Sequence, residues 1–555
     1  MKGSITKAGW TVLAACLVLV AAQSAFASAS TEKAATVQEK VLYLSANGEF
    51  DNLDPRVLTS TGHQLVQFGI FEPLVRTHAG QLLPGMAQSW EISKDGMVYT
   101  FHLRDAKWSD GKPVTGADFV HAFVRMFQIC PASPIYDDIK NGAELRSQKV
   151  QPSELGVKAP DDKTVVITLK NPAPYFMGLI SSSFGSPGRE DLVAKFGDGY
   201  GASAESLASN GPFILTEWKK EDKVVMVKNP NYWNASAIKL DKVVVYILPN
   251  AQTQRNLFDN GELDVYIPRS ESEAKDYEAK GLLTRYVAGG IRCLQLNRHG
   301  QNDPVKAKIL SNPSFMKAIS YAIDRQGYID NVLQGAGYPA TVQTPPATGV
   351  YPGKTWGDVS VNMGKYHPKT ADLAKSKTYM DAVLKDMGFS SVSQMPTFTF
   401  LTSVSPDDPK DVTGYLLSVF KDMGLKVDVV LATGNQFYNN LYKPALAYDI
   451  VRAGWGPDFD DPATYMGYWT AASTDMGVTF ENAQFDALLD QANKETDLVK
   501  RAAILNQAEA LFSDVAPAIP IMWNKGSIAL QSRVKGFTTA LTGLTTDYVF
   551  ADVVK

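Results

Sequence analysis

Between residues 397 and 451 the sequence alternates between strand-like and helix-like segments, which restricts the chain to a small set of folds. Strands that alternate with helices predict an α/β lobe, in which ligand sites lie just beyond the strand ends. In chain order the expected segments are a strand at Thr397–Leu401, a helix at Val412–Met423, a strand at Leu425–Leu431, a helix near Gln436–Tyr442 and a strand at Tyr448–Val451.

The last of these strands leads into a glycine-rich turn. Gly454 and Gly456 flank Trp455, and Asp458 follows on a Gly-Pro turn. Because glycine has no side chain, another chain can closely approach the backbone N–H and C=O groups there. A carboxylate beside such an opening is suited to holding an amine. The residues alone leave a second interpretation open, in which Trp455 is a core aromatic residue and Asp458 a turn former.

A hairpin and an amphipathic helix are predicted nearer the N-terminus. Ser89–Ser93 and Val98–Arg104 flank the turn sequence Lys94-Asp95-Gly96, and the second segment alternates apolar and polar residues. Thr115 and Asp118 have the spacing of a helix capping box. The apolar residues that follow at helical spacing are interpreted as core packing: Phe119, Phe123, Met126 and Phe127.

The segment Arg452-Ala453-Gly454-Trp455-Gly456-Pro457-Asp458-Phe459-Asp460-Asp461-Pro462 resembles an element of the family 5 extracellular solute-binding proteins, the peptide-binding components of ABC importers. Further blocks resemble signatures of this family in the same order, and the resemblance covers nearly all of the chain after its first residues. These blocks are Leu53-Asp54-Pro55, 70–74, 83–90, 95–111, 210–213, 228–233, 261–265 and 322–325.

The resemblance implies a fold of the α/β class. It is a two-lobed periplasmic-binding-protein clamshell, type II-like, with a third, extra domain. Domain I would be assembled from residues 28–80, 205–288 and 525–555, the extra domain II from 81–204, and domain III, the second ligand-binding lobe, from 289–524. The chain crossings near residues 288 and 524 would form the hinge.

The resemblance also implies roles for individual residues. In peptide-binding members the aspartate of this element holds the α-ammonium of the ligand, and that role falls here on Asp458. The backbone of Gly454, Trp455 and Gly456 would pair with the ligand backbone. Six further ligand contacts are implied: Glu49 and Phe50 on the first strand of domain I, Tyr266 and Trp523 lining pockets, and Arg452 and Lys443 as partners of a peptide carboxylate. A solvated side chain is the alternative for Lys443 and for Arg452.

We therefore expect an extracytoplasmic receptor that captures oligopeptides or dipeptides between two lobes. It would deliver them to an ABC-type permease in the cytoplasmic membrane, and we expect a monomer without a cofactor. Two alternatives remain open at this point. One is the same fold with a changed cargo, such as a nickel chelate, haem, an opine or an oligosaccharide, and the other is a ligand-loaded partner of a chemoreceptor.

The sequence does not favour an enzyme. No nucleophile paired with a base, no phosphate cradle and no HExxH pairing among the six histidines is apparent in it. The glycine-containing segments 185–188 and 197–201 lack the spacing of a nucleophile elbow or a dinucleotide loop. We expect neither a catalytic site nor a metal site.

Residues 1–27 have the pattern of a secretory signal, and Ala25-Phe26-Ala27 is a small-x-small cleavage site. Cleavage would release the protein into the periplasm. In an alternative interpretation, Cys16 belongs to a lipoprotein box and anchors the protein to a membrane. Removing residues 1–27 takes away two lysines and no acidic residue, which changes the formal charge from −4 to −6 and argues against a nucleic-acid partner.

Two cysteines, Cys130 and Cys293, remain after cleavage. Some enteric relatives join a cysteine matching Cys293 to one matching Gly456, and the glycine at that position excludes this bridge here. Whether Cys130 and Cys293 pair with each other stays open, because sequence separation does not reveal spatial distance.

Overall fold

The computed structural model describes residues 39–57, 61–130, 133–403, 411–441, 445–471, 480–515, 518–541 and 546–554. The chain divides into two units, residues 1–40 and residues 41–555, and every helix and strand described below lies in the second. The expected signal sequence at 1–27, including Cys16, and Lys443 both lie outside the described residues.

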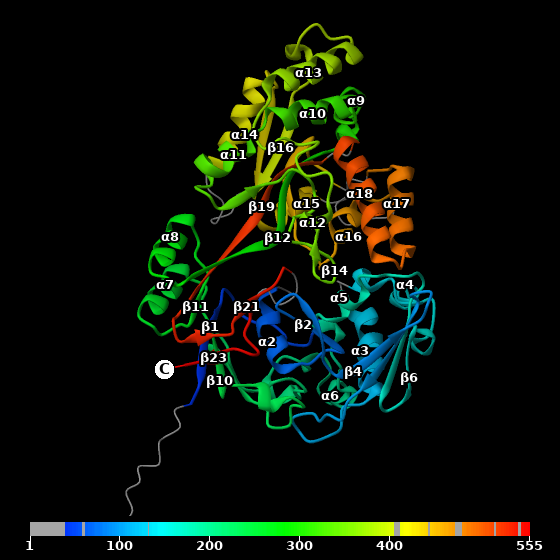
Figure 1. Cartoon of the computed structure of the whole chain (residues 1–555), viewed down its shortest axis with the longest axis vertical. Coiled ribbons are helices and arrows are strands. Elements are labelled where there is room, and N and C mark those ends of the chain that lie inside the picture. The colour runs from blue at the N-terminus through cyan, green and yellow to red at the C-terminus, as the bar shows by residue number, and fades with distance from the viewer. Residues whose placement is uncertain are drawn as a thin grey trace, which may run out of the picture. The chain divides into compact units, whose positions relative to one another are not determined.

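The first sheet is built from the N-terminal strand and a later group of three. Its order is β1 (Val41–Ala46), β10 (Lys242–Ile247), β9 (Lys223–Lys228) and β8 (Phe213–Lys219), with β1 and β10 parallel and the other pairs antiparallel. Alternate residues of β1 are buried, because successive side chains of a strand point to opposite faces. These strands come from segments that the sequence predicts for domain I (Figure 1).

The second sheet lies within residues 81–204, the segment expected to form the extra domain. Its antiparallel order is β4 (Ala87–Ile92), β5 (Val98–Leu103), β7 (Thr164–Thr168) and β6 (Val157–Asp161). The predicted hairpin is confirmed as β4 and β5. Helix α3 (Gly116–Ile129) begins at Thr115 with the predicted capping box to Asp118, and the four apolar residues predicted to be core are buried.

The third sheet has seven strands and contains the alternating segment 397–451. Its order is β11 (Val265–Tyr266), β19 (Ala518–Leu530), β12 (Leu283–Leu296), β18 (Ile450–Trp455), β16 (Phe398–Ser403) and β17 (Val427–Ala432), and β13 (Gly337–Pro339) also pairs with β19. Strand β16 is parallel to both β17 and β18. The three predicted strands and the helices α14 (Asp411–Asp422) and α15 (Gly434–Leu441) are confirmed within a few residues.

Helices cover both faces of this sheet at its β16–β18 end. Phe400 and Ile450 pack into one core with residues of α10 (Pro313–Ala322), α13 (Leu373–Met387) and α14. Leu401 and Val451, which point the opposite way, pack into another core with residues of α17 (Ala483–Lys494) and α18 (Leu498–Val515). A sheet enclosed in this way is typical of the α/β class.

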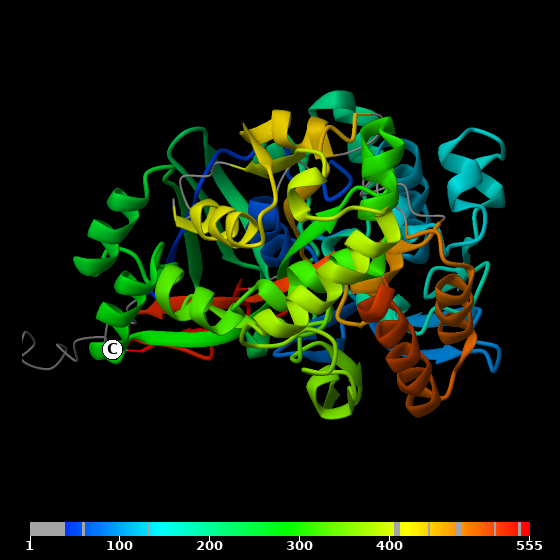
Figure 2. The same cartoon turned by 90° about the horizontal axis from the view of Figure 1, so that it is seen from above.

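The long strands β12 and β19 run side by side through the positions expected to form the hinge (Figures 1 and 2). Val287 pairs with Lys525 and Ile291 pairs with Trp523, so the register shifts where Gly289 and Gly290 are inserted. A Cβ atom on Gly290 would overlap the side chain of Asn524, which explains why a glycine is needed there. The division into three domains and the hinge itself stay predictions.

The two cysteines do not form a disulfide. Cys130 and Cys293 are buried thiols in different parts of the described chain, and burial raises the pKa of the Cys293 thiol to about 12. Among the described residues, no helix combines the length and the apolar character that are needed to cross a membrane.

Candidate functional site

Strand β18 is longer than the sequence analysis expected, and this changes the position of the glycine-rich segment. In register, Trp455 pairs with Ile291 and Gly454 pairs with Arg292 on β12. The prediction that the strand ends at Val451 is therefore wrong: pairing with β12 continues the strand through Gly454 and Trp455, and the turn begins at Gly456. Gly454 is required by packing, since an added Cβ would meet the Ile291 carbonyl and the Arg292 side chain.

An aromatic cluster forms where β12, β18 and β19 lie side by side. Ile291 pairs with Trp455 on one neighbouring strand and with Trp523 on the other, and Tyr465 and Val342 belong to the same cluster. Both tryptophans are predicted from the sequence to lie at the site, and the register places them in one cluster. The Trp523 indole N–H is buried and has no hydrogen-bond partner among the described residues, so it is available to an acceptor.

The turn that follows Trp455 is open to water. Gly456 is exposed, and a Cβ atom placed on it would have no protein atom within 4 Å. The side chain of Asp458 is exposed, and its backbone N–H donates to Thr464 Oγ1 at 3.0 Å. The turn thus presents accessible backbone and an accessible carboxylate together.

Two further carboxylates in this turn, those of Asp460 and Asp461, have separate structural roles. The Asp461 carboxylate is buried and accepts two hydrogen bonds from the Arg501 guanidinium, at 2.6 and 2.8 Å. Asp460 is exposed and accepts a hydrogen bond from the Gly349 backbone N–H at 2.6 Å. Asp461 anchors the turn to α18, and Asp460 joins it to β14 (Gly349–Tyr351).

The site has a negative electrostatic character. Burial raises the pKa of the Tyr465 hydroxyl well above its ordinary range, and the charges of Asp460 and Asp458 add to this shift. Desolvation also raises the pKa of Asp460, although its side chain still reaches water. Both effects indicate acidic groups close to a partly desolvated surface, where a cation such as an ammonium group is favoured.

The turn also contacts the segment expected to be the extra domain. Phe459 stacks on Tyr175, with ring centroids 4.4 Å apart and planes at 12°. The Tyr175 hydroxyl donates to Asp138 at 2.8 Å, which keeps the ring in place. Parallel aromatic stacking of this kind stabilises the turn. The turn is therefore held by Tyr175, which precedes it in the sequence, and by Arg501, which follows it.

A buried glutamate binds the segment that follows Val342, a residue of the aromatic cluster. Glu509 on α18 accepts hydrogen bonds from the Thr344 backbone N–H at 3.1 Å and from the Trp356 indole N–H at 2.8 Å. Burial raises the pKa of Glu509 from 4.5 to about 7, although these hydrogen bonds act in the opposite direction. The ionised form is therefore costly in the folded protein.

This shift predicts a pH-dependent stability. A carboxyl whose pKa is raised by folding contributes stability that is complete below its unfolded pKa and is lost as the pH rises through its folded pKa. Between pH 4.5 and 7 the wild type should lose up to about 3 kcal/mol relative to Glu509→Gln, which cannot ionise. Melting curves of both proteins from pH 4 to 8 test this, and parallel pH profiles would contradict it.

The structure places the other expected ligand residues differently. Strand β1 ends at Ala46, so Glu49 and Phe50 do not lie on it as expected. The Phe50 side chain is buried against His63, and the Glu49 carboxylate accepts from the Glu221 backbone N–H at 2.5 Å and from the Trp218 indole N–H at 3.3 Å. Both side chains therefore serve the lobe's own packing in this structure.

Tyr266 does not line a pocket here. Its side chain is 2% exposed, packs with Phe258 and Tyr277, and donates to Glu273 at 2.8 Å. The alternation of β11 turns it into a core, whereas its neighbours Val265 and Ile267 line a pocket on the other side. Arg452 is buried and faces away from Trp455 for the same reason, because the two residues are three positions apart on one strand.

Some site residues were missed because their contacts join distant parts of the chain. Arg501 is 40 residues from Asp461, and Gly349 is 111 residues from Asp460. Tyr465 donates to the Gly289 carbonyl at 2.7 Å across 176 residues. No local pattern signals such pairs. Among the described residues, no group of His, Cys, Asp and Glu is suited to hold a metal ion.

Comparison with known sequences identifies relatives over most of the chain. The model of the bacterial extracellular solute-binding proteins, family 5, matches residues 81–477. The chain is 31% identical over 488 residues to the oligopeptide-binding protein OppA of Bacillus subtilis (strain 168), covering 85% of each. It is 29% identical over 529 residues to the probable deoxycholate-binding periplasmic protein YgiS of Escherichia coli (strain K12), covering 94% of each.

A solved structure gives the same result for the fold. Haemophilus influenzae OppA in complex with the peptide RPPGFSPFR superimposes with a TM-score of 0.75 at 25% sequence identity, covering 93% of this chain and 99% of that chain. The two-lobed α/β solute-binding fold expected from the sequence is therefore confirmed. The chain belongs to family 5 of the bacterial extracellular solute-binding proteins.

Proposed function

We propose that this protein is the extracytoplasmic receptor of an ABC importer, that it captures peptides, and that it delivers them intact to a membrane permease. The observation that carries this proposal is the exposed carboxylate of Asp458, which follows the open turn at Gly456 beside the Trp455–Trp523 cluster. Membership of a solute-binding family supports it. Relatives whose names state oligopeptide or dipeptide binding support the choice of cargo.

The chemistry of a peptide fits this arrangement. Asp458 would hold the α-ammonium, and the accessible backbone at Gly456 would pair with the first peptide groups, as an added strand pairs with a sheet. The aromatic cluster would contact the apolar parts of the ligand. A receptor that binds the amine and the backbone of a peptide in this way tolerates many peptide side chains, as long as these side chains occupy hydrated space.

The lobes would close over the ligand. We propose the paired strands β12 and β19, near residues 288 and 524, as the hinge, because the register shift at Gly289 and Gly290 lies there. A ligand that contacts both lobes binds the closed state more tightly and shifts the population toward it. Domains I, II and III, with the bounds predicted from the sequence, are the moving bodies in this proposal.

We further propose that residues 1–27 direct export and are removed, which leaves Ser28 as the mature N-terminus in the periplasm. Periplasmic relatives from Salmonella typhimurium and Escherichia coli support an extracytoplasmic location. The intact mass of the exported protein decides the point. A diacylglycerol adduct on Cys16 would instead establish the lipid-anchored form.

The proposed function is tested by melting the protein with a set of di- to hexapeptides. A ligand that binds only the folded state stabilises it by RT ln(1 + [L]/Kd), about 2.7 kcal/mol at a hundredfold excess over Kd, so the melting temperature should rise with peptide concentration. The peptide should be recovered uncleaved by mass analysis, and a cleaved peptide would indicate an enzyme.

A changed cargo remains the second possibility, because the relative from Escherichia coli is named for deoxycholate, which has no amine. The two cases differ in a measurable way. A cargo without an amine should bind equally well when Asp458 is replaced. A melting shift with such a compound and with no peptide would favour this second function.

A further inference from the structure

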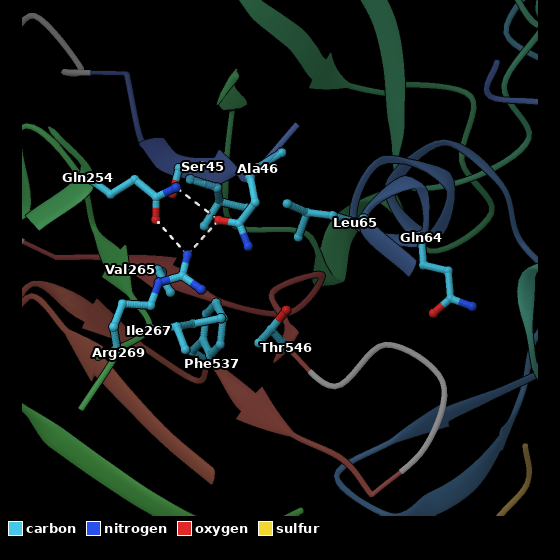
Figure 3. Close-up of a pocket in the computed structure, with 13 residues that line it drawn as sticks. Ser45, Ala46, Gln64, Leu65, Gln254, Val265, Ile267, Arg269, Phe537 and Thr546 are labelled. Atoms are coloured by element: carbon cyan, nitrogen blue, oxygen red, sulfur yellow. Dashed lines mark hydrogen bonds between the residues drawn. The ribbon is translucent and has the colours of Figure 1, made fainter. Parts of the chain in front are cut away.

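We propose that a pocket beside strands β1 and β11 binds a carboxylate of the peptide ligand through Arg269, and this inference rests on the proposed function. The pocket has a volume of about 300 Å³, at the lower end of the range for ligand sites. It lies at the carboxyl ends of β1 and β11, and Ala46, Val265 and Phe537 are among its lining residues. Figure 3 shows Arg269 beside Gln254, with Ile267 and Phe537 close to it.

The Arg269 guanidinium is bonded only to neutral groups. Its Nη2 donates to Asn47 Oδ1 at 2.7 Å and to Gln254 Oε1 at 3.4 Å. Its Nε is buried and has no hydrogen-bond partner among the described residues. No acidic side chain lines the pocket, and within the described part of the chain Arg269 forms no ion pair. A donor of the guanidinium is therefore left for a ligand.

Other arginines of the same region are paired with carboxylates. Arg255 contacts Glu273 at 3.3 Å, Arg285 contacts Glu271 at 2.7 Å, and Arg533 contacts Asp264 at 2.6 Å. Glu273 on α8 (Glu271–Ala279) accepts from the Arg269 backbone N–H at 3.0 Å and from Tyr266 at 2.8 Å, and it pairs with Arg255 instead of the Arg269 guanidinium. Arg269 is thus a cation that is held in place by the side-chain amides of Asn47 and Gln254 and that has no carboxylate partner among the described residues.

A carboxylate matches these features. The planar guanidinium presents its N–H groups in a fork that suits the two oxygens of a carboxylate. Leu65, Val265 and Phe537 provide apolar walls for the carbon atoms next to that group. Because a hydrogen bond from a charged guanidinium to an ionised acceptor is stronger than one to a neutral acceptor, a carboxylate on Arg269 should bind more tightly than its neutral amide.

The pocket lies within peptide reach of Asp458. Phe537 precedes the hairpin of β21 (Thr538–Thr539) and β22 (Thr546–Asp547), and the carbonyl of Leu541 lies against Gly289, as does Pro457. Four extended residues span about 13 Å, so the pocket wall and Pro457 lie within roughly 20 Å of each other. An extended peptide of about six residues spans this length with its ammonium on Asp458.

Calorimetry with matched peptides tests the proposal and separates the two sources of the carboxylate. The peptides have four to six residues, a free N-terminus and otherwise neutral side chains. Two positions are varied: the C-terminus is free or amidated, and one inner residue is Glu or Gln. At least one carboxylate form should bind about ten- to a hundredfold more tightly than its neutral counterpart. The pair that shows the difference identifies a C-terminal or a side-chain carboxylate.

Variants assign the preference to Arg269. Arg269→Met, which keeps the apolar stem, should reduce the ratio to below about threefold while changing the affinity for the neutral form little. Arg269→Lys keeps the charge but not the fork, and should retain part of the ratio. Arg255→Met removes a charge from the neighbour of Gln254 and leaves the pocket lining intact, so it should retain the full ratio.

The outcomes distinguish this inference from the proposed function. Equal affinities within every pair, or an unchanged ratio in Arg269→Met, would overturn the carboxylate pocket while peptide binding stands. If the wild type binds none of the peptides, the proposed function fails and this inference fails with it. The melting temperature of each unliganded variant shows whether a lost preference reflects the pocket or the fold.

Discussion

Replacement of Asp458 by alanine should weaken peptide binding by about two to three and a half powers of ten. In the closed complex the carboxylate and the ligand ammonium would be buried together, and removing one partner of a buried charge pair costs roughly 3–5 kcal/mol. Calorimetry with a neutral tripeptide that has a free N-terminus measures the loss. Acetylation of the peptide N-terminus should reduce the affinity for the wild type by a comparable factor.

Variants of Asp458 and acetylated peptides provide the controls for this prediction. The melting temperature of unliganded Asp458→Ala, measured beside its affinity, separates a lost ligand contact from a change in the fold. Asp458→Asn keeps the shape and removes the charge, and should lose most of the same affinity. Equal binding of free and acetylated peptides by the wild type would show that another group holds the amine.

Replacement of Asp461 by alanine should instead destabilise the fold, although it lies only three residues away. Asp461 and Arg501 form a bidentate pair in which the side chains are 7% and 1% exposed. Removing Asp461 leaves the Arg501 charge buried without this partner, at a cost of about 3–5 kcal/mol. Thermal melting of the unliganded protein should show a decrease of several degrees.

A double variant separates the lost charge partner from the lost packing. Asp461→Leu combined with Arg501→Met replaces the pair by apolar side chains and should recover much of the stability, because no buried charge remains. A single variant Asp461→Ala that melts like the wild type would contradict the structural role given to this pair. The neighbours Asp458 and Asp461 thus give opposite expected results, one in binding and one in stability.

Local sequence patterns predicted the elements near the site well. The capping box at Thr115 and Asp118, the hairpin of β4 and β5, and the alternation of strands and helices from β16 to β18 depend on contacts between residues close in sequence. For such elements the periodicity of apolar residues and the chemistry of turns contain most of the information. The resemblance of the segment 452–462 and of the further blocks, in the same order, to one family then predicted the fold.

Predictions about single side chains were less successful, since they depend on strand ends and register. Tyr266 was expected to line a pocket, but its position on β11 turns it into a core, whereas Val265 and Ile267 line the pocket instead. The end of β1 at Ala46 likewise removed Glu49 and Phe50 from the strand. A shift of one residue reverses the face to which a side chain points, and the sequence does not reveal such a shift.

The sequence by itself therefore determined the class of fold, the family and the turn that carries Asp458, since these follow from local patterns and from an ordered set of motifs. Only the tertiary structure decided which residues surround that turn. Trp455 and Trp523 belong to one cluster because both pair with Ile291, and Asp461 is anchored because it is bonded to Arg501 on α18. Arg269 and its pocket emerged only from the fold, because a missing counter-ion is a property of the surrounding space and has no local signal in the sequence.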